Sequence, residues 1–290
     1  LMDELSSCAR QRGMRVLFGR CYEEGGAPPY WPWVQVVRAY LSETPPEEIS
    51  TMLGSRAPLV TAMFPELGEH LPGLEPFEAG SQDPEAVRFR LFDAVVSFLV
   101  DISNTSPTLI VLDDLHWSDD SSLKLLVFLA RELERSHLYV LGTYRDVDLD
   151  RKHPLSDALG ELARERLFGR HPLKGFTLPD VHSYIQAVSG SNPPERLARA
   201  VLELTSGNPL FVSQMTRLLA QDEKYRSYFR EGTAANEMRL PEGVREVIGK
   251  RLNHLSQECN EILVAAAVLG PEFRLRGLIL TMGEQSEESV

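Results

Sequence analysis

The sequence has few cysteines and no long apolar run. Its three cysteines (Cys8, Cys21 and Cys259) are scattered along 290 residues without the spacing of a zinc site or of a disulfide framework. So sparse a set is typical of a reducing compartment, and we expect the protein to be cytoplasmic. No apolar run approaches the ~20 residues that a membrane-spanning helix requires, and the first residues show no secretory signal. The sequence therefore predicts neither a membrane protein nor a secreted one.

Basic residues are in the minority as well. The chain carries 30 Lys and Arg against 42 Asp and Glu, which gives a formal net charge of −12. A surface of that sign repels the phosphate backbone of nucleic acids, so we expect no direct nucleic-acid binding by these residues. The length suggests about two domains, or three small ones, since a domain averages roughly 150 residues.

The chain also lacks the sequence Gly-x-x-x-x-Gly-Lys-Ser/Thr, the loop that cradles nucleotide phosphates between a strand and a helix. The nearest approach begins at Gly243, but its glycines are one residue too far apart and Arg251 replaces Ser or Thr. This stretch also falls inside an expected helix, 244–255. There is no Gly-x-Ser-x-Gly elbow, so Ser/His/Asp catalysis has no support.

Short apolar runs alternate with helical patterns in the first part of the chain. Three runs predict buried strands, and a fourth is a candidate: 14–19, 108–114, 137–145 and 173–178. Helical patterns cover 1–12, 33–41, 83 to about 102, a helix capped by Ser118, and 154–168, with short helices and loops over 44–84. This alternation predicts an α/β fold with a parallel sheet covered on both faces.

Only helices are expected after residue 178. Their apolar spacing predicts them at 179–188, 193–204, 209–220, 244–255 and 259–269. The polar stretch 221–239 is predicted to be a linker. The sequence therefore predicts an α/β part followed by an all-helical part.

Two acids, Asp113 and Asp114, end the second apolar run. In an open parallel sheet, ligands bind beyond the carboxyl ends of the strands. A carboxylate delivered there can serve the water shell of Mg²⁺, while a second carboxylate polarises an attacking water. Arg145 ends the next predicted strand, from which a guanidinium can reach a γ-phosphate. The pattern therefore indicates a nucleotide-hydrolysing site.

Simpler interpretations of these residues stay open. The two acids can merely open a turn and cap the next helix, and Arg145 can form a surface ion pair with Asp146. A hydrolytic metal site made of Asp113, Asp114 and His116 is disfavoured, because adjacent residues of a strand point to opposite faces.

Five motifs in order carry a resemblance to a known family. They are GRCYEEGGAPPYWPW (19–33), LIVLDDLHWSDDSSLKLL (109–126), LGTYRD (141–146), LTSGNPLFV (204–212) and LPEGVREVIGKRL (240–252). Together they resemble the ATPase module of STAND-type signalling NTPases. More narrowly, they resemble the AAA-type module of large bacterial LuxR-type (MalT-like) transcriptional regulators, which is also attached to class III nucleotide cyclases and Ser/Thr kinases.

The resemblance implies a domain organisation. It implies a P-loop NTPase sheet without its first strand and Walker A loop over 1–178, a helical lid over 179–230, and part of a winged-helix domain over 231–290. Residues 1–5 resemble the helix that directly follows the Walker A loop in this family, so we expect a fragment that starts just after that loop.

The resemblance also implies ATP or ADP with Mg²⁺ as ligands, and roles for single residues. Asp113 would hold Mg²⁺ through water, Asp114 would polarise the attacking water, and Arg145 would sense the γ-phosphate. Residues 207–209 (Gly207, Asn208 and Pro209) would lie near adenine. Their simpler interpretation is a helix C-cap followed by a proline that starts the next helix, which is compatible with the first. His116 and Trp117 are expected to be a spacer and a packing residue.

The expected function is therefore an ATP-binding regulatory module with slow, resetting hydrolysis. Its partners would be an effector domain in the same parent chain and an inducer, either a protein or a small molecule. Without a Walker A loop, these residues alone would bind ATP weakly or not at all. The alternative is a nucleotide-free interaction scaffold with Tyr30–Trp33 as its sticky surface, although these aromatics also fit a Pro-rich loop folded onto the sheet edge.

Overall fold

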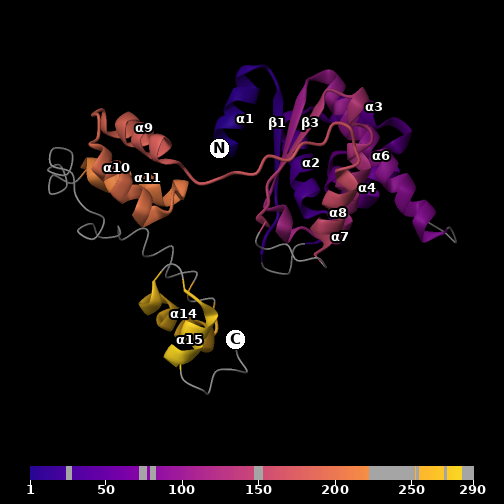
Figure 1. Ribbon diagram of the computed structural model, residues 1–290. Coiled ribbons are helices and arrows are strands. Elements are labelled where there is room, and N and C mark those ends of the chain that lie inside the picture. Colours follow the sequence, from indigo (N-terminus) through magenta and orange to yellow (C-terminus); the bar gives the residue numbers. More distant parts are fainter. Residues whose placement is uncertain are drawn as a thin grey trace. The chain divides into compact units, whose positions relative to one another are not determined.

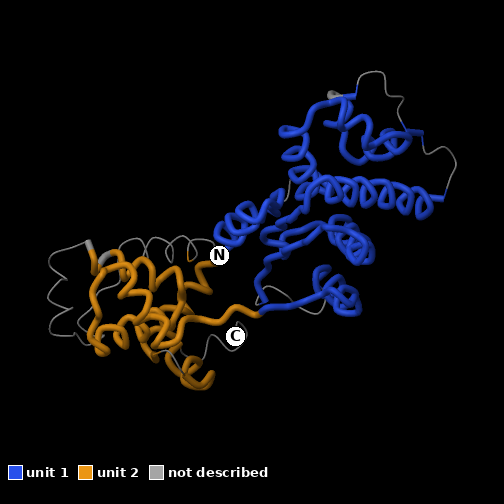
Figure 2. The backbone as a smooth tube through the Cα atoms, turned by 90° about the horizontal axis from the view of Figure 1, so that it is seen from above, with its two compact units in different colours: residues 1–171 blue, residues 172–290 orange. Residues whose placement is uncertain are grey.

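The chain forms two compact units in the computed structural model, residues 1–171 and 172–290 (Figure 2). The structure describes residues 1–23, 28–71, 77–78, 83–146, 153–221, 252, 255–270 and 273–282. Nearly all of the predicted linker 221–239 and most of the predicted helix 244–255 lie outside these residues. The predicted boundaries at residues 178 and 230 stay predictions.

The first unit is built on a parallel sheet of three strands in the order β1-β2-β3 (Figure 1). The strands are β1 (Arg15–Arg20), β2 (Thr108–Asp113) and β3 (Leu138–Gly142). The central strand β2 is buried along its length up to Asp113, because it has neighbours on both sides. The predicted α/β fold with a parallel sheet is confirmed, and all three strands end at the same edge.

Helices cover both faces of this sheet, as the apolar strands predict. Leu109 and Val111 of β2 pack with Ala9 of helix α1 on one face. Ile110 and Leu112, which alternate with them, join the main core with α2, α6 and α7 on the other face (Figure 1). The helices of this unit are α1 (Met2–Gln11), α2 (Trp31–Glu43), α3 (Pro46–Leu53), η1 (Gly54–Arg56), α4 (Ala57–Met63), α5 (Glu66–His70), α6 (Pro84–Thr105), η2 (Leu115–Trp117), α7 (Asp120–Ala130), η3 (Leu133–Arg135) and α8 (Pro154–Leu162).

Residues 172–290 contain only helices among those described. These are α9 (Leu178–Ser189), α10 (Glu195–Thr205), α11 (Pro209–Gln221), α14 (Gln257–Leu269) and α15 (Leu275–Met282). The first three share one apolar core around Val181, Leu197 and Val212. No described helix of the chain is both long and apolar enough to cross a membrane.

Residues 173–178 are not a strand, so the prediction of a fourth strand is wrong. The backbone N–H of Phe176 donates to the Gly207 carbonyl at 2.7 Å and therefore bonds to a turn instead of a sheet. The next residue, Thr177, is the N-cap of α9 and shares a capping box with Asp180. Leu173 is 79% exposed, as no buried strand residue would be.

Two further helix boundaries differ from the predictions. Asp119, not Ser118, caps α7, because its carboxylate accepts from the Ser122 N–H at 3.0 Å. The helix that starts at Pro154 ends at Leu162 and does not reach residue 168. Both differences are local and leave the sheet unchanged.

Candidate functional site

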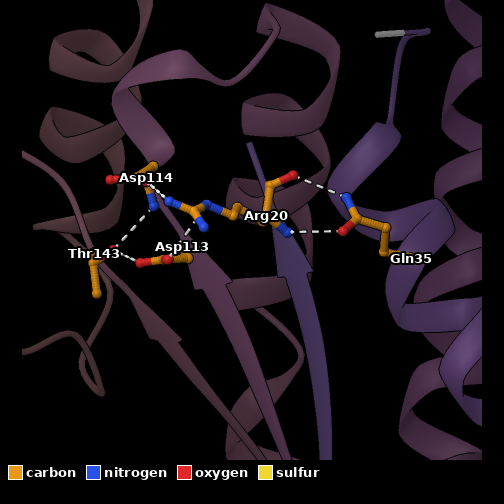
Figure 3. A network of polar contacts seen from close by, with 5 residues as sticks. All are labelled: Arg20, Gln35, Asp113, Asp114 and Thr143. Carbon is orange, nitrogen blue, oxygen red and sulfur yellow. Dashed lines mark hydrogen bonds and ion pairs between the residues drawn. The ribbon is translucent and has the colours of Figure 1, made fainter. Parts of the chain in front are cut away.

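Side chains from the ends of all three strands meet at the carboxyl edge of the sheet (Figure 3). Arg20, the last residue of β1, stands beside Asp113, the last residue of β2, in the strand register. Thr143 follows the end of β3 directly. The left-handed residue Asp114 completes the group. This edge is where an open parallel sheet binds ligands.

Thr143 holds Asp113 in place. Its hydroxyl donates to Asp113 Oδ1 at 2.6 Å and accepts from the Asp114 backbone N–H at 3.0 Å. Its own backbone N–H donates to the Leu112 carbonyl at 3.0 Å. One carboxylate oxygen of Asp113 is thus occupied by a neutral donor, and the other faces Arg20.

Asp114 leaves the strand by a left-handed turn. Its φ of 58° and ψ of 45° are rare for residues with a side chain, although Asp and Asn tolerate them best. This turn ends the alternation of β2. Regular strand geometry would place the two carboxylates on opposite faces of the sheet. Because of this turn, both carboxylates instead contact the same guanidinium. Arg20 Nη2 lies 3.2 Å from Asp114 Oδ2, and Arg20 Nε lies 3.8 Å from Asp113 Oδ2.

Arg20 is a residue of this site that the sequence reasoning missed. Its backbone is tied to α2 by Gln35, whose amide nitrogen donates to the Arg20 carbonyl at 2.8 Å and whose amide oxygen accepts from the Arg20 N–H at 3.4 Å (Figure 3). The signal was available, because Arg20 follows the first apolar run just as Asp113 ends the second. Parallel strands bring such positions to one edge.

Arg145 lies three residues beyond the end of β3 and its side chain is exposed. The strand ends at Gly142, so the prediction of a strand through residue 145 is wrong. Asp146, the partner in the simpler interpretation of Arg145, pairs with Arg170 at 2.7 Å. The role of Arg145 at a γ-phosphate stays a prediction.

Gly207, Asn208 and Pro209 form the turn between α10 and α11 in the second unit. Gly207 has a φ of 72°, and a Cβ on it would lie 2.3 Å from the Phe176 carbonyl oxygen, so the turn requires glycine. Asn208 Oδ1 accepts from the Leu210 N–H at 3.0 Å and caps α11. The helix-boundary interpretation is therefore confirmed. Asn208 and Pro209 also line an open hollow of about 670 Å³; the adenine role stays a prediction.

The aromatic segment 30–33 is packed inside the first unit. Trp33 is 1% exposed, and its indole N–H donates to the Ser122 carbonyl at 3.1 Å. Tyr30 and Trp31 are half-buried against the same core. The segment starts helix α2 rather than a loop. The interpretation of these aromatics as a sticky surface is not supported.

A hydrolytic metal site around His116 is not supported either. His116 is 3% exposed, with its ring centroid 5.0 Å from that of Trp117. No group of three or more His, Cys, Asp or Glu side chains in the described part of the chain is placed to hold a metal ion.

Residues 1–141 match the AAA ATPase domain. This match supports an AAA-type P-loop ATPase module, with which the mixed α/β fold and the parallel sheet are consistent. An uncharacterized protein of Rhizobium meliloti (strain 1021) is 24% identical over 314 residues, which cover 99% of this chain and 28% of that protein. The chain thus spans less than a third of this relative.

The residues at the carboxyl edge fit the Mg²⁺ on which AAA ATPase domains typically depend. Asp113 and Asp114 offer carboxylate oxygens, the ligands that Mg²⁺ prefers, and they already hold one cation, the Arg20 guanidinium. Asp113 would hold the ion through water, and the ion would neutralise charge on the nucleotide phosphates. The phosphate-binding loop of such a domain is not among these 290 residues.

Cys21 follows the end of β1 and is hydrogen-bonded to the backbone of Asp113. Its backbone N–H donates to the Asp113 carbonyl at 3.0 Å, and its side chain is 4% exposed. Burial raises the pKa of its thiol to about 11, although the nearby Ser118 hydroxyl acts in the opposite direction; the charges of Asp119, Asp114 and Asp113 add to the rise. The thiol is therefore protonated and shielded at neutral pH.

We expect iodoacetamide at about pH 8 to modify the partly exposed Cys8 and Cys259 in the native protein and to spare Cys21. Because the folded thiol keeps its proton above the ordinary pKa of 9.0, the free energy of unfolding should fall as the pH rises from about 9 to about 11. Mass spectrometry of labelled peptides checks the first expectation, and denaturant unfolding at each pH checks the second. Rapid labelling of native Cys21 would contradict its burial.

Proposed function

We propose that these residues form the ATP-binding regulatory module of a multidomain bacterial signalling protein. The paired acids at the carboxyl edge of a parallel sheet carry this proposal, and the match of residues 1–141 to the AAA ATPase domain supports it. The ligands would be ATP or ADP with Mg²⁺. The parent would be a LuxR-type transcriptional regulator, although a nucleotide cyclase or a Ser/Thr kinase would fit these residues as well.

Each predicted residue then has a task. Asp113, held by Thr143, takes the Mg²⁺ side, and Asp114 polarises the attacking water. Arg145 stabilises charge on the γ-phosphate. The turn at residues 207–209 is assigned to adenine on the family resemblance alone.

Regulation follows if ATP and ADP bind two states of the protein with different affinities, since a ligand shifts an equilibrium only by its differential affinity. Slow hydrolysis then resets the switch. An effector domain in the same parent chain would read the state, and an inducer would bias it.

We further propose that a phosphate-binding loop outside these 290 residues completes the site. Among the described strands, both β1 and β3 have a neighbour on one side only, and the other edge of β3 can take a further strand. The Rhizobium meliloti relative, of which the chain spans 28%, leaves room for such a segment.

Nucleotide titration tests the proposal. We expect the full-length gene product to bind MgATP at least about 100-fold more tightly than residues 1–290 alone, because a phosphate cradle adds several charge-assisted hydrogen bonds. Isothermal titration calorimetry with ATP and ADP, each with and without Mg²⁺, measures both affinities. Tight binding by residues 1–290 would contradict the need for a further loop. No binding by the full-length gene product would contradict the function and favour a nucleotide-free scaffold.

A further inference from the structure

We propose that Arg20 is a positioning residue that competes with Mg²⁺ for Asp113 and Asp114, and so sets the Mg²⁺ concentration that the site requires. The inference rests on the proposed function and names a control built into the same site. Neither the strand pattern nor the family motifs assign Arg20 a role. Its position between the two acids does.

The competition is for one oxygen atom. Thr143 already donates to Asp113 Oδ1 at 2.6 Å. The remaining oxygen, Oδ2, lies 3.8 Å from Arg20 Nε. The guanidinium therefore lies against the Asp113 oxygen that Thr143 leaves free.

The same guanidinium also reaches Asp114, whose Oδ2 lies 3.2 Å from Nη2. One positive charge thus serves two adjacent negative charges and offsets part of their mutual repulsion. Mg²⁺ carries twice that charge and prefers the same carboxylate oxygens. A metal-bound water that hydrogen-bonds to Asp113 Oδ2 needs the place that the guanidinium occupies, so binding of the metal requires the guanidinium to leave.

Arg20 is held so that only its side chain can leave. Its backbone pairs with β2 on one side and is bonded to Gln35 of α2 on the other. The side chain is 54% exposed, so the guanidinium can swing into solvent without unfolding anything. Ion pairs this exposed are weak, and a divalent cation can displace one. The ion pair of Arg20 with the two acids can therefore break without a change in the fold.

The test measures Mg²⁺ binding without turnover. The midpoint of thermal unfolding (Tm) of the full-length protein is followed against MgCl₂ at constant ionic strength, without nucleotide and with ADP. We expect Arg20→Ala to lower the Mg²⁺ concentration of half-maximal stabilisation about three- to five-fold, because a weak competitor is lost. Arg20→Lys, which keeps the charge, should restore most of the wild-type requirement. Arg20→Gln serves as the uncharged variant if the alanine protein does not fold.

Arg131→Ala is the matched control. Arg131 also bridges two carboxylates, those of Glu161 at 3.6 Å and Glu165 at 3.8 Å, and is 56% exposed, yet it belongs to the α7–α8 region. This variant should keep the wild-type Mg²⁺ requirement.

Each outcome decides between the two proposals. If Mg²⁺ stabilises the wild type and both uncharged Arg20 variants equally, or stabilises those variants only at higher concentrations, the role of Arg20 is overturned and the proposed function stands. If Mg²⁺ with ADP leaves the wild type unaffected, both are overturned.

Discussion

Replacing Asp114 by Asn in the full-length protein is expected to lower ATP turnover about 10²–10⁴-fold while MgATP stays bound. The amide keeps the size of the carboxylate but cannot accept a proton from the attacking water. Asn also tolerates the left-handed backbone of this position, with its φ of 58°, so the turn into η2 should be preserved. Phosphate release measures turnover, and nucleotide titration measures binding.

Asp120→Asn is the control for this experiment. Asp120 lies in the first turn of α7 and pairs with Lys124 at 2.6 Å on an exposed surface, so its loss should leave turnover unchanged. Equal turnover in Asp114→Asn and wild type would remove Asp114 from its proposed role. Loss of binding together with turnover would assign it to nucleotide affinity instead.

Gly19→Ala is expected to lower the free energy of unfolding by about 1–3 kcal/mol, the usual range for an overpacked core. A Cβ on Gly19 would lie 2.2 Å from the Pro32 carbonyl oxygen and 2.9 Å from its carbon. The backbone at Pro32 cannot move away easily, because the buried Trp33 anchors this end of α2. Gly19 cannot move away either, because β1 is paired with β2. The separation of β1 from α2 should also displace the neighbouring Arg20. Denaturant unfolding of residues 1–290 gives the free energy.

Gly160→Ala provides the opposite case. Gly160 lies in helix α8, and a Cβ there meets nothing within 4 Å. Because alanine favours helix more than glycine does, this change should raise the free energy of unfolding by about 1 kcal/mol. If Gly19→Ala leaves the free energy of unfolding unchanged or raises it, close packing of β1 on α2 is not what requires Gly19.

The sheet was predictable because β2 and β3 are apolar along almost their whole length and β1 is apolar between its two terminal arginines. Alternation with helices then implied the parallel arrangement, and burial of β2 up to Asp113 agrees with it. Residues 173–178 were not predictable in the same way. The run looks like a strand, but the hydrogen bond of Phe176 goes to Gly207. A single sequence does not show whether a backbone N–H donates to a neighbouring strand or to a distant turn.

Only those residues of the site could be predicted whose type and position in the sequence suggest a function. Asp113 and Asp114 stand out because they end an apolar run at the edge where parallel sheets bind ligands, although a run that ends in acids is common. Thr143 and Arg20 are ordinary residues, and their importance depends on a strand register that places Arg20 beside Asp113. The left-handed turn at Asp114, which brings the two carboxylates together, leaves no mark in the sequence beyond a residue that tolerates it.

The contact of Gln35 with Arg20 has a consequence for self-association. Its side-chain amide satisfies both outward-facing backbone groups of Arg20 and so mimics a neighbouring strand at the end of β1. A second molecule cannot extend the sheet there without first removing that amide. Among the described strands, the opposite border, β3, has no such guard. Addition of a further strand should therefore be hindered at the end of β1, where Arg20 lies, more than at β3.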